Sequence, residues 1–380
     1  MLSSHKQIQV PKTLDVEAIE RELATLWVKT SQDVTDQQEN AVMRARVANL
    51  MIFVPTRANL EEINATLVEL SSVHPCRALV VAIERDAAEH DIEMYVSSFC
   101  RGAIESKTKE LCCEEVTLVA GGKFVEELPS ATLPLLVPDL PVFLWWHDDF
   151  SLHDSVFEQL SRGADRLIID SLSFLSEDLY AVAQLSANAD HKRLGISDIN
   201  WERLTSWRAL LASFYDVAQY RPALEALSKI EVDYLSPETS TDVIAPQAIL
   251  IAGWLASRLG WQPVIESREI TADGLQIDLN RQNRNIKLEL RKTSRPDMRP
   301  GRLARVALKS ESESAGLAVS RGAQGLHLEA HANINGQIQP GQLLPVRNRS
   351  SAQLIGREME LLVHDKIYGE SVAMGMTLTR

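Results

Sequence analysis

The sequence predicts an α/β fold in two parts: an N-terminal mixed or mostly parallel sheet flanked by helices, and a C-terminal α+β domain with helices and an antiparallel sheet. Up to about residue 175, short apolar runs alternate with segments of helical periodicity; beyond about residue 264, apolar residues recur at every second position. The chain has 380 residues, 45% of them hydrophobic, which suits two cores. We therefore expect domains at 1–175 and 176–380.

In the N-terminal domain, amphipathic helices are predicted over residues 14–29 and from Asn59 onward, where Glu62 stands three places after a capping residue. Apolar runs bounded by turn residues predict strands over 47–55, 74–84, 92–100, 114–122, 140–146 and 165–170, with a short helix over 154–161. Strands that alternate with helices indicate a sheet covered on both faces.

The C-terminal domain is expected to begin with helices between about 176 and 260, at 196–216, 222–231 and 247–259. An antiparallel sheet should follow over about 264–332, because Ile286, Leu288 and Leu290 alternate with charged residues. An amphipathic helix over about 352–368 is predicted to close the domain.

Composition excludes several classes of protein. The net charge of −13 argues against nucleic acid or an anionic membrane as a partner. The N-terminus does not resemble a secretory signal, and the apolar stretch at 248–256 is about half of what a membrane span needs. We therefore expect a soluble, cytoplasmic protein. The glycine-rich, metal-binding and nucleophile motifs of common enzymes are missing from the sequence, so we predict no cofactor, no metal and no catalytic residue.

One apolar strand ends in an unusual run, "WWHDD", at residues 145–149. Open α/β sheets bind ligands at the carboxyl ends of their strands, so a ligand or partner site is one interpretation. The alternative is structural: the tryptophans fill a core and the acidic residues end the strand and cap the next helix. The candidate residues are Trp145, Trp146, His147 and Asp148.

The segment from Arg281 to Lys309 is strongly basic, with ten Lys or Arg residues against Glu289 and Asp297. Such a cluster favours a phosphorylated small molecule, or an acidic surface on another protein. Arg291, Lys292 and Arg295 are the candidate phosphate ligands, and a sugar phosphate is the candidate effector. A charged sheet edge and loop is the alternative.

Two further clusters can be interpreted either as structural or as functional. His327, Glu329 and His331 alternate on one strand, but at nearly 7 Å spacing they favour a solvated face over a metal site. The four cysteines are expected to be reduced and structural. If the strands at 92–100 and 114–122 pair as a hairpin, Cys100 and Cys112 could meet, and a redox role for Cys100, Cys112 and Cys113 is the alternative.

Several stretches together resemble the glucose-6-phosphate dehydrogenase assembly protein family (OpcA): "RARVANLMIFV", "HPCRALVV", "CCEEVTLVAGG", "LPLLVPDLPVFLWWHDD" and "DINWERLTSWRALLASFYD". The resemblance runs from about residue 40 to 220 and continues more weakly to the end of the chain. His147 stands where the family often has arginine, and Cys76 where it usually has serine.

The resemblance implies a protein that is not itself an enzyme. It would bind glucose-6-phosphate dehydrogenase of the oxidative pentose phosphate pathway, support its assembly and raise its activity as an allosteric activator. Tryptophan and arginine dominate many protein interfaces, so the strand-end residues are one candidate contact. A second comprises Trp201, Arg203, Trp207 and Arg208, at helical spacing. The alternative function is a sugar-phosphate sensor or enzyme that uses residues 281–309.

Overall fold

The computed structural model describes residues 8–9, 16–35, 43–44, 46–71, 73–85, 89–100, 111–147, 150–187, 194–237, 244–310, 315–334, 336–339, 341–346, 349–360 and 364–380. The chain forms two compact units. Unit 1 comprises Met1–Ile169, Lys192–Ser197 and Arg349–His364, and unit 2 comprises Asp170–His191, Asp198–Asn348 and Asp365–Arg380. No helix of the described residues is long and apolar enough to cross a membrane.

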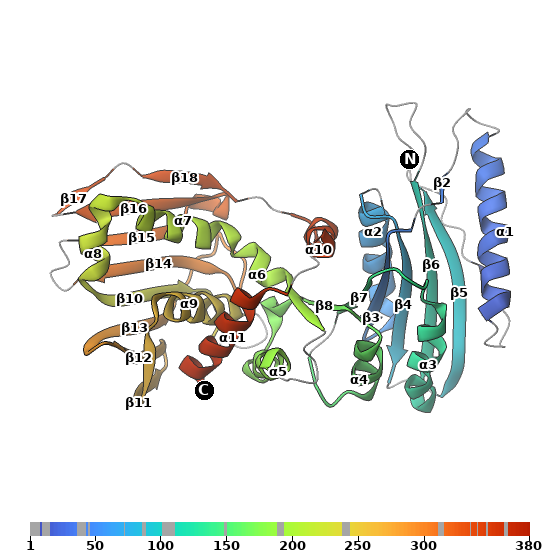
Figure 1. Cartoon of the computed structure of the whole chain (residues 1–380), viewed down its shortest axis with the longest axis horizontal. Coiled ribbons are helices and arrows are strands. Elements are labelled where there is room, and N and C mark those ends of the chain that lie inside the picture. The colour runs from blue at the N-terminus through green and yellow to red at the C-terminus, as the bar shows by residue number, and fades with distance from the viewer. Residues whose placement is uncertain are drawn as a thin grey trace. The chain divides into compact units, whose positions relative to one another are not determined.

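Unit 1 is built on a nine-stranded sheet of order β1-β5-β6-β4-β3-β7-β8-β9, with β2 paired to β6 (Figure 1). Its strands are β1 (Ile8–Gln9), β2 (Met43–Arg44), β3 (Ala48–Val54), β4 (Cys76–Glu84), β5 (His90–Cys100), β6 (Leu111–Gly121), β7 (Val142–Trp146), β8 (Arg166–Ile169) and β9 (Gly195–Asp198). Its helices are α1 (Val16–Thr35), α2 (Leu60–Ser71), α3 (Leu128–Thr132), α4 (Ser155–Arg162) and α10 (Ser351–Glu360), with the 3-10 turns Arg57–Asn59, Gly122–Glu127 and Leu133–Leu135.

The central strands of this sheet are parallel, because β3 pairs in parallel with β4 and β7, and β4 with β6. All seven residues of β3 are buried, as expected for a strand covered on both faces. Strand β5 runs antiparallel to β6. The predicted mixed or mostly parallel sheet flanked by helices is therefore confirmed.

Two local details of unit 1 differ from the expectation. Thr56, not Asn59, provides the cap before α2: its hydroxyl accepts from the backbone N–H of Ala58 and starts a 3-10 turn. Residues Gly195–Asp198, expected at the start of a helix, form the edge strand β9. All four are buried, so sheet pairing outweighs the local helical pattern.

Unit 2 is built on a second nine-stranded sheet of order β11-β12-β13-β10-β14-β15-β16-β17, with β18 paired to β16. Its strands are β10 (Leu227–Tyr234), β11 (Gln262–Thr271), β12 (Gly274–Arg281), β13 (Arg284–Lys292), β14 (Leu303–Ser310), β15 (Ala315–Arg321), β16 (His327–Ile334), β17 (Gln337–Ile338) and β18 (Gln342–Pro345). Its helices are α5 (Ser176–Ala187), α6 (Ile199–Arg203), α7 (Thr205–Asp216), α8 (Arg221–Glu225), α9 (Pro246–Leu259) and α11 (Lys366–Thr379), with the 3-10 turns Ser171–Ser173, Ala218–Tyr220 and Ala323–Gly325.

The helix expected over 222–231 is wrong beyond its first turn. Helix α8 ends at Glu225 and β10 begins at Leu227. Ile230, Val232 and Tyr234 are buried alternately with charged residues, which is the period of a strand. Because β10 pairs in parallel with β13 and antiparallel with β14, the sheet is antiparallel except at this one pair.

The single closing helix expected over 352–368 is two helices, α10 and α11. Asp365 begins the second one, since its carboxylate accepts from the backbone N–H of Tyr368. Helix α10 belongs to unit 1 and α11 to unit 2. In unit 2, α11 packs closely against α9.

Candidate functional site

The two tryptophans at the end of β7 lie in the core of unit 1. Trp146 stacks on Phe53 with the ring centroids 3.7 Å apart and meets Phe157 edge-on at 5.2 Å. Trp145 and Trp146 are only 4% and 2% exposed, whereas His147 is half-buried beside Trp145. Asp148 lies outside the described residues. A partner contact through this strand end stays a prediction, with His147 as its accessible side chain.

The four candidate residues of the segment that starts at Asp198 lie in unit 2. Trp201 donates its indole N–H to Asp365 at 3.0 Å, and Trp207 is 1% exposed. The Arg208 guanidinium lies over the Trp201 ring, 3.6 Å from its centroid. Arg203 forms two parallel hydrogen bonds with Asp170, at 2.6 and 2.7 Å. Their role toward a partner also stays a prediction.

A buried polar network that the sequence did not predict surrounds Asp198. Its carboxylate accepts from the Ser171 hydroxyl at 2.6 Å and from the Tyr368 hydroxyl at 3.2 Å. Burial, the largest effect, raises the pKa of Asp198 to about 6. The Asn200 amide extends the network to Gln247, whose carbonyl accepts from the backbone N–H of Leu303. In the sequence, only Gln247, a polar residue at the start of an apolar helix, could have indicated this network.

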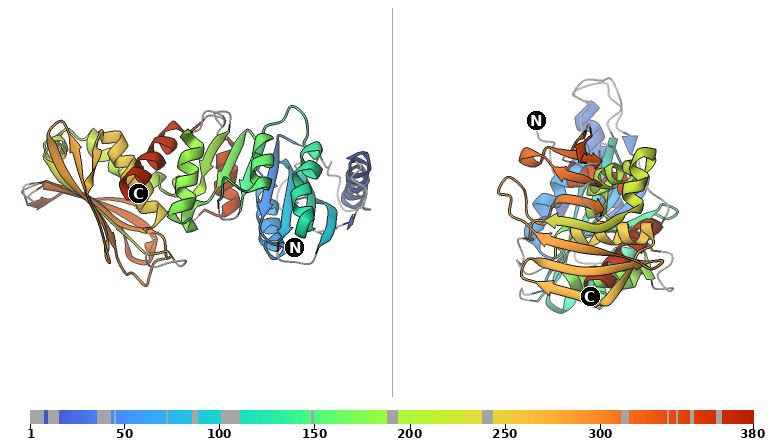
Figure 2. Two further views of the ribbon diagram at one scale, coloured as in Figure 1. Left: turned by 90° about the horizontal axis from the view of Figure 1, so that it is seen from below. Right: turned by 90° about the vertical axis from the view of Figure 1, so that its left-hand side faces the viewer.

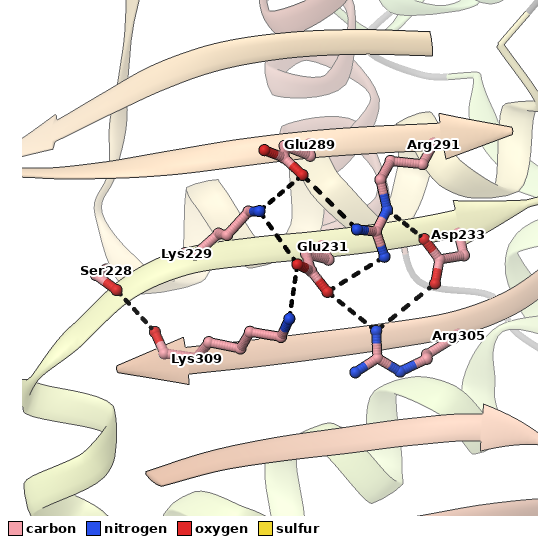
Figure 3. A network of polar contacts seen from close by, with 8 residues as sticks. All are labelled: Ser228, Lys229, Glu231, Asp233, Glu289, Arg291, Arg305 and Lys309. Atoms are coloured by element: carbon pink, nitrogen blue, oxygen red, sulfur yellow. Dashed lines mark hydrogen bonds and ion pairs between the residues drawn. The ribbon is translucent and has the colours of Figure 1, made fainter. Parts of the chain in front are cut away.

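The basic segment is divided among several carboxylates. Arg291 donates to Asp233 at 2.7 Å and to Glu231 at 3.2 Å (Figure 3). Arg295 pairs with Asp297. Lys292 makes no ion pair within the part of the chain that the structure describes. Two of the three predicted phosphate ligands are therefore already compensated.

Glu231 is the centre of this ion-pair network. Its side chain is 2% exposed and lies next to four cations, from Lys229, Arg291, Arg305 and Lys309. Burial alone would raise the pKa of Glu231, but hydrogen bonds from Lys309, Arg305 and Lys229 outweigh it and lower the pKa to about 2. The charges are therefore held in fixed positions.

This network lies on the sheet face opposite the helices of unit 2, which we call the open face. Helices lie on only one side of the sheet in the left view of Figure 2, where α7, α8 and α9 pack against the strands. The register continues the open face from Asp233 through Arg305 and Ser320 to Glu329. At its rim, Ile338 and Leu343 are 77% and 71% exposed. The open face thus combines pre-positioned charges with exposed aliphatic side chains.

The histidines of β16 also lie on the open face. Glu329 hydrogen-bonds His327 at 2.7 Å and lies 3.6 Å from a ring nitrogen of His331. The hydrogen bond with His327 is the main reason why the pKa of Glu329 is lowered. Among the described residues, no three His, Cys, Asp or Glu side chains are grouped so that they could hold a metal.

The cysteines lie on three neighbouring strands of unit 1. The hairpin register makes Cys100 and Cys112 direct partners, and Cys113 meets Cys76 across β6 and β4, where the Cys76 N–H donates to the Cys113 sulfur at 3.2 Å. The interaction between the two thiol side chains raises the pKa of Cys76 and lowers the pKa of Cys113. Cys76, which the sequence did not suggest as a partner, is buried with Cys113. The redox role stays a prediction.

The fold and these surfaces define a two-unit α/β protein with one open sheet face. Family models named glucose-6-phosphate dehydrogenase subunit N-terminal domain and C-terminal domain match residues 68–187 and 194–372. The chain therefore belongs to the OpcA family of glucose-6-phosphate dehydrogenase subunits.

Three relatives are each described as a candidate OxPP cycle protein, OpcA. The one from Synechococcus elongatus is 28% identical over 318 residues, which cover 80% of this chain and 68% of the relative. The Synechocystis relative is 28% identical over 81% of this chain and 64% of its own length. The Nostoc punctiforme relative is 30% identical over 53% of this chain and 41% of its own length, so two of the three are matched over less than two thirds of their length.

Among solved structures, the chain is similar to KijD10, a 3-ketoreductase from Actinomadura kijaniata that was crystallised with NADP. The TM-score is 0.50, with 10% identity over 87% of this chain and 95% of KijD10. At this identity the similarity concerns the fold alone.

Proposed function

We propose that this protein is a non-catalytic assembly factor and allosteric activator of glucose-6-phosphate dehydrogenase, acting by protein–protein binding in the cytoplasm. The observation that carries the proposal is the match of both family domain models along most of the chain. Activation requires preferential binding to the active form of the dehydrogenase, because only a difference in affinity between two forms shifts their equilibrium.

The turn from β3 into α2 supports a role without nicotinamide chemistry. Strand β3 leads into Pro55, Thr56 and Arg57. A dinucleotide-binding enzyme of this general architecture uses glycine there, because the backbone must approach the pyrophosphate closely. Arg57 instead pairs with Glu93 of β5.

The open face of unit 2 is the surface that we propose for this contact. Charges fixed by ion pairs lose little side-chain entropy when a partner arrives, and a mixed pattern of positive and negative groups favours one orientation of the partner. The exposed Ile338 and Leu343 at the rim add apolar area that water leaves on binding. A partner of matching chemistry presents charges to Arg291 and Arg305 and apolar side chains to the rim.

The direct test is a titration of this protein into purified glucose-6-phosphate dehydrogenase from the same organism. Activity is followed at each point, and size-exclusion chromatography of the mixture is run in parallel. Saturable activation with co-elution is the expected result, and the protein alone should show no turnover. If activity stays constant and the two proteins elute separately, the proposal is wrong.

The contact is mapped with matched surface variants. Leu343→Asp places a charge at the rim of the open face. It should raise the concentration of this protein needed for half-maximal activation at least tenfold. Val73→Asp is the control, because Val73 is 67% exposed in unit 1. Arg208→Glu and His147→Glu test the two alternative surfaces. Activation lost in either of these variants, but kept in Leu343→Asp, would move the contact away from the open face.

A further inference from the structure

Three arginines of unit 2 converge on one place in the fold. Arg302 directly precedes β14, Arg321 ends β15, and Arg203 ends α6. Arg321 donates to the carbonyl of Leu303, the residue after Arg302, and Gln247 links the backbone of Leu303 to Asn200 of α6 through two hydrogen bonds. Because positions 203, 302 and 321 are far apart in the chain, no run of basic residues in the sequence indicates this cluster. Arg302 lies in the basic segment 281–309, where the sequence alone does not distinguish it from the other basic residues.

Two of the three guanidinium groups have partners within the protein. Arg203 is held by both oxygens of Asp170. Arg321 donates to the backbone carbonyls of Leu303 at 3.3 Å and Gly325 at 3.2 Å, which carry no formal charge. Arg302 makes no side-chain hydrogen bond or ion pair with any described residue, although it is half-buried.

The positive charge of the cluster exceeds its negative charge. Burial, followed by repulsion from Arg203, Arg321 and, more weakly, Arg299, lowers the pKa of Arg302 to about 10. Asp170 is the carboxylate that acts against this repulsion, and it is already paired with Arg203. With Arg299 also nearby, the guanidinium charges outnumber this one carboxylate and are partly withdrawn from water, which is costly without a counterion.

We propose that Arg302, together with Arg203 and Arg321, binds the phosphate group of a small phosphorylated ligand. A guanidinium presents a planar fork of donors that matches phosphate oxygens, so this cluster suits a phosphate better than a chloride ion. The site is separate from the open face, and ligand binding there requires no dehydrogenase. Its failure is therefore distinguishable from a failure of the proposed function.

The first test measures thermal unfolding of the full chain as inorganic phosphate is added at constant ionic strength. Saturable binding should raise the Tm by a few °C. Arg302→Gln should lose this increase, while its Tm without phosphate stays at or above that of the wild type because a like charge is gone. Arg281→Gln is the control, since Arg281 is exposed at the other end of the sheet, where β12 and β13 turn beside the start of β10, and it should keep the increase. No Tm increase in the wild type, or the same increase in Arg302→Gln, would overturn the proposal.

A second test needs no variant. Phenylglyoxal modifies arginine, and mass spectrometry reads its adducts residue by residue. Phosphate should slow modification of Arg302 at least fivefold and leave the modification of the exposed Arg281 unchanged. Equal modification of Arg302 with and without phosphate would contradict the proposal.

The same two measurements with a hexose phosphate separate the sources of the phosphate group. Half-saturation at a lower concentration than for inorganic phosphate assigns the site to a phosphate ester. Half-saturation at the same concentration assigns it to the free ion.

Discussion

Two nearly inaccessible carboxylates on the sheets have opposite environments. Glu231 of unit 2 is surrounded by cations and its pKa is lowered to about 2, so its charge is stabilised. Glu115 of unit 1 is buried, and this burial raises its pKa to about 7 although Thr117 donates a hydrogen bond to it at 2.5 Å. At the scale of single residues, the neighbours decide whether a glutamate supports the fold as an anion or as a neutral acid.

The environment of Glu115 predicts a pH dependence of stability. Its folded-state pKa, about 7, lies above the ordinary value of 4.5, so the folded state binds the proton more tightly than the unfolded state. The free energy of unfolding should therefore fall as the pH rises from about 4.5 to 7, by up to roughly 3 kcal/mol. Glu115→Gln should remove this loss, so its advantage over the wild type should be larger at pH 8 than at pH 5.

Urea unfolding of the full chain at the two pH values measures this difference. Glu61→Gln is the matched control, because Glu61 is exposed on α2 of the same unit. An equal stability difference between Glu115→Gln and wild type at pH 5 and pH 8 would show that the pKa of Glu115 is not raised in the folded protein.

At the scale of elements, helix packing in unit 2 depends on two glycines. A side chain on Gly253 of α9 would collide with the carbonyl oxygen of Ser371 and lie 2.5 Å from the backbone nitrogen of Gly375 in α11. A side chain on Gly375 would lie 2.8 Å from the carbonyl oxygen of Ile249. The two backbones are thus close enough that only glycine fits at the crossing.

Gly253→Ala should destabilise unit 2 by about 2–4 kcal/mol, because backbone atoms cannot move aside as flexible side chains do. Gly369→Ala in α11, the helix that carries Gly375, is the control. Its added methyl group would meet Ser186 at an ordinary 3.9 Å, so it should be neutral or stabilising by up to about 1 kcal/mol. Thermal unfolding of the two variants provides the comparison, and equal effects would exclude a tight α9–α11 crossing.

At the scale of the whole molecule, the net charge of −13 coexists with a unit that concentrates basic side chains on one sheet. If the open face contacts the dehydrogenase, charged groups contribute to association and salt should screen them. The concentration of this protein needed for half-maximal activation should rise several-fold between 50 and 500 mM salt. The activity of the dehydrogenase alone at each salt concentration is the control. If the concentration for half-maximal activation does not change with salt, the contact is apolar.

The sequence alone was sufficient for the α/β class and for most strands, because apolar runs such as "ANLMIFV" in β3 carry their own periodicity. It also identified the family, through stretches that include the buried Trp145–Trp146 pair and the segment from Asp198 onward. It failed at β10 and β9, where pairing with neighbouring strands outweighs a helical pattern.

Which charged side chains are paired, and which are not, was decided only by the tertiary structure. Arg291, Arg295 and Arg302 look alike in the sequence, yet Asp233 and Asp297 compensate the first two while Arg302 is left with other arginines beside it. Asp297 is a sequence neighbour of Arg295, but Asp233 comes from β10, and the arginines beside Arg302 come from α6 and β15, which are distant in the chain. Periodicity is a local property that the sequence displays, whereas charge compensation exists only after these elements have packed together.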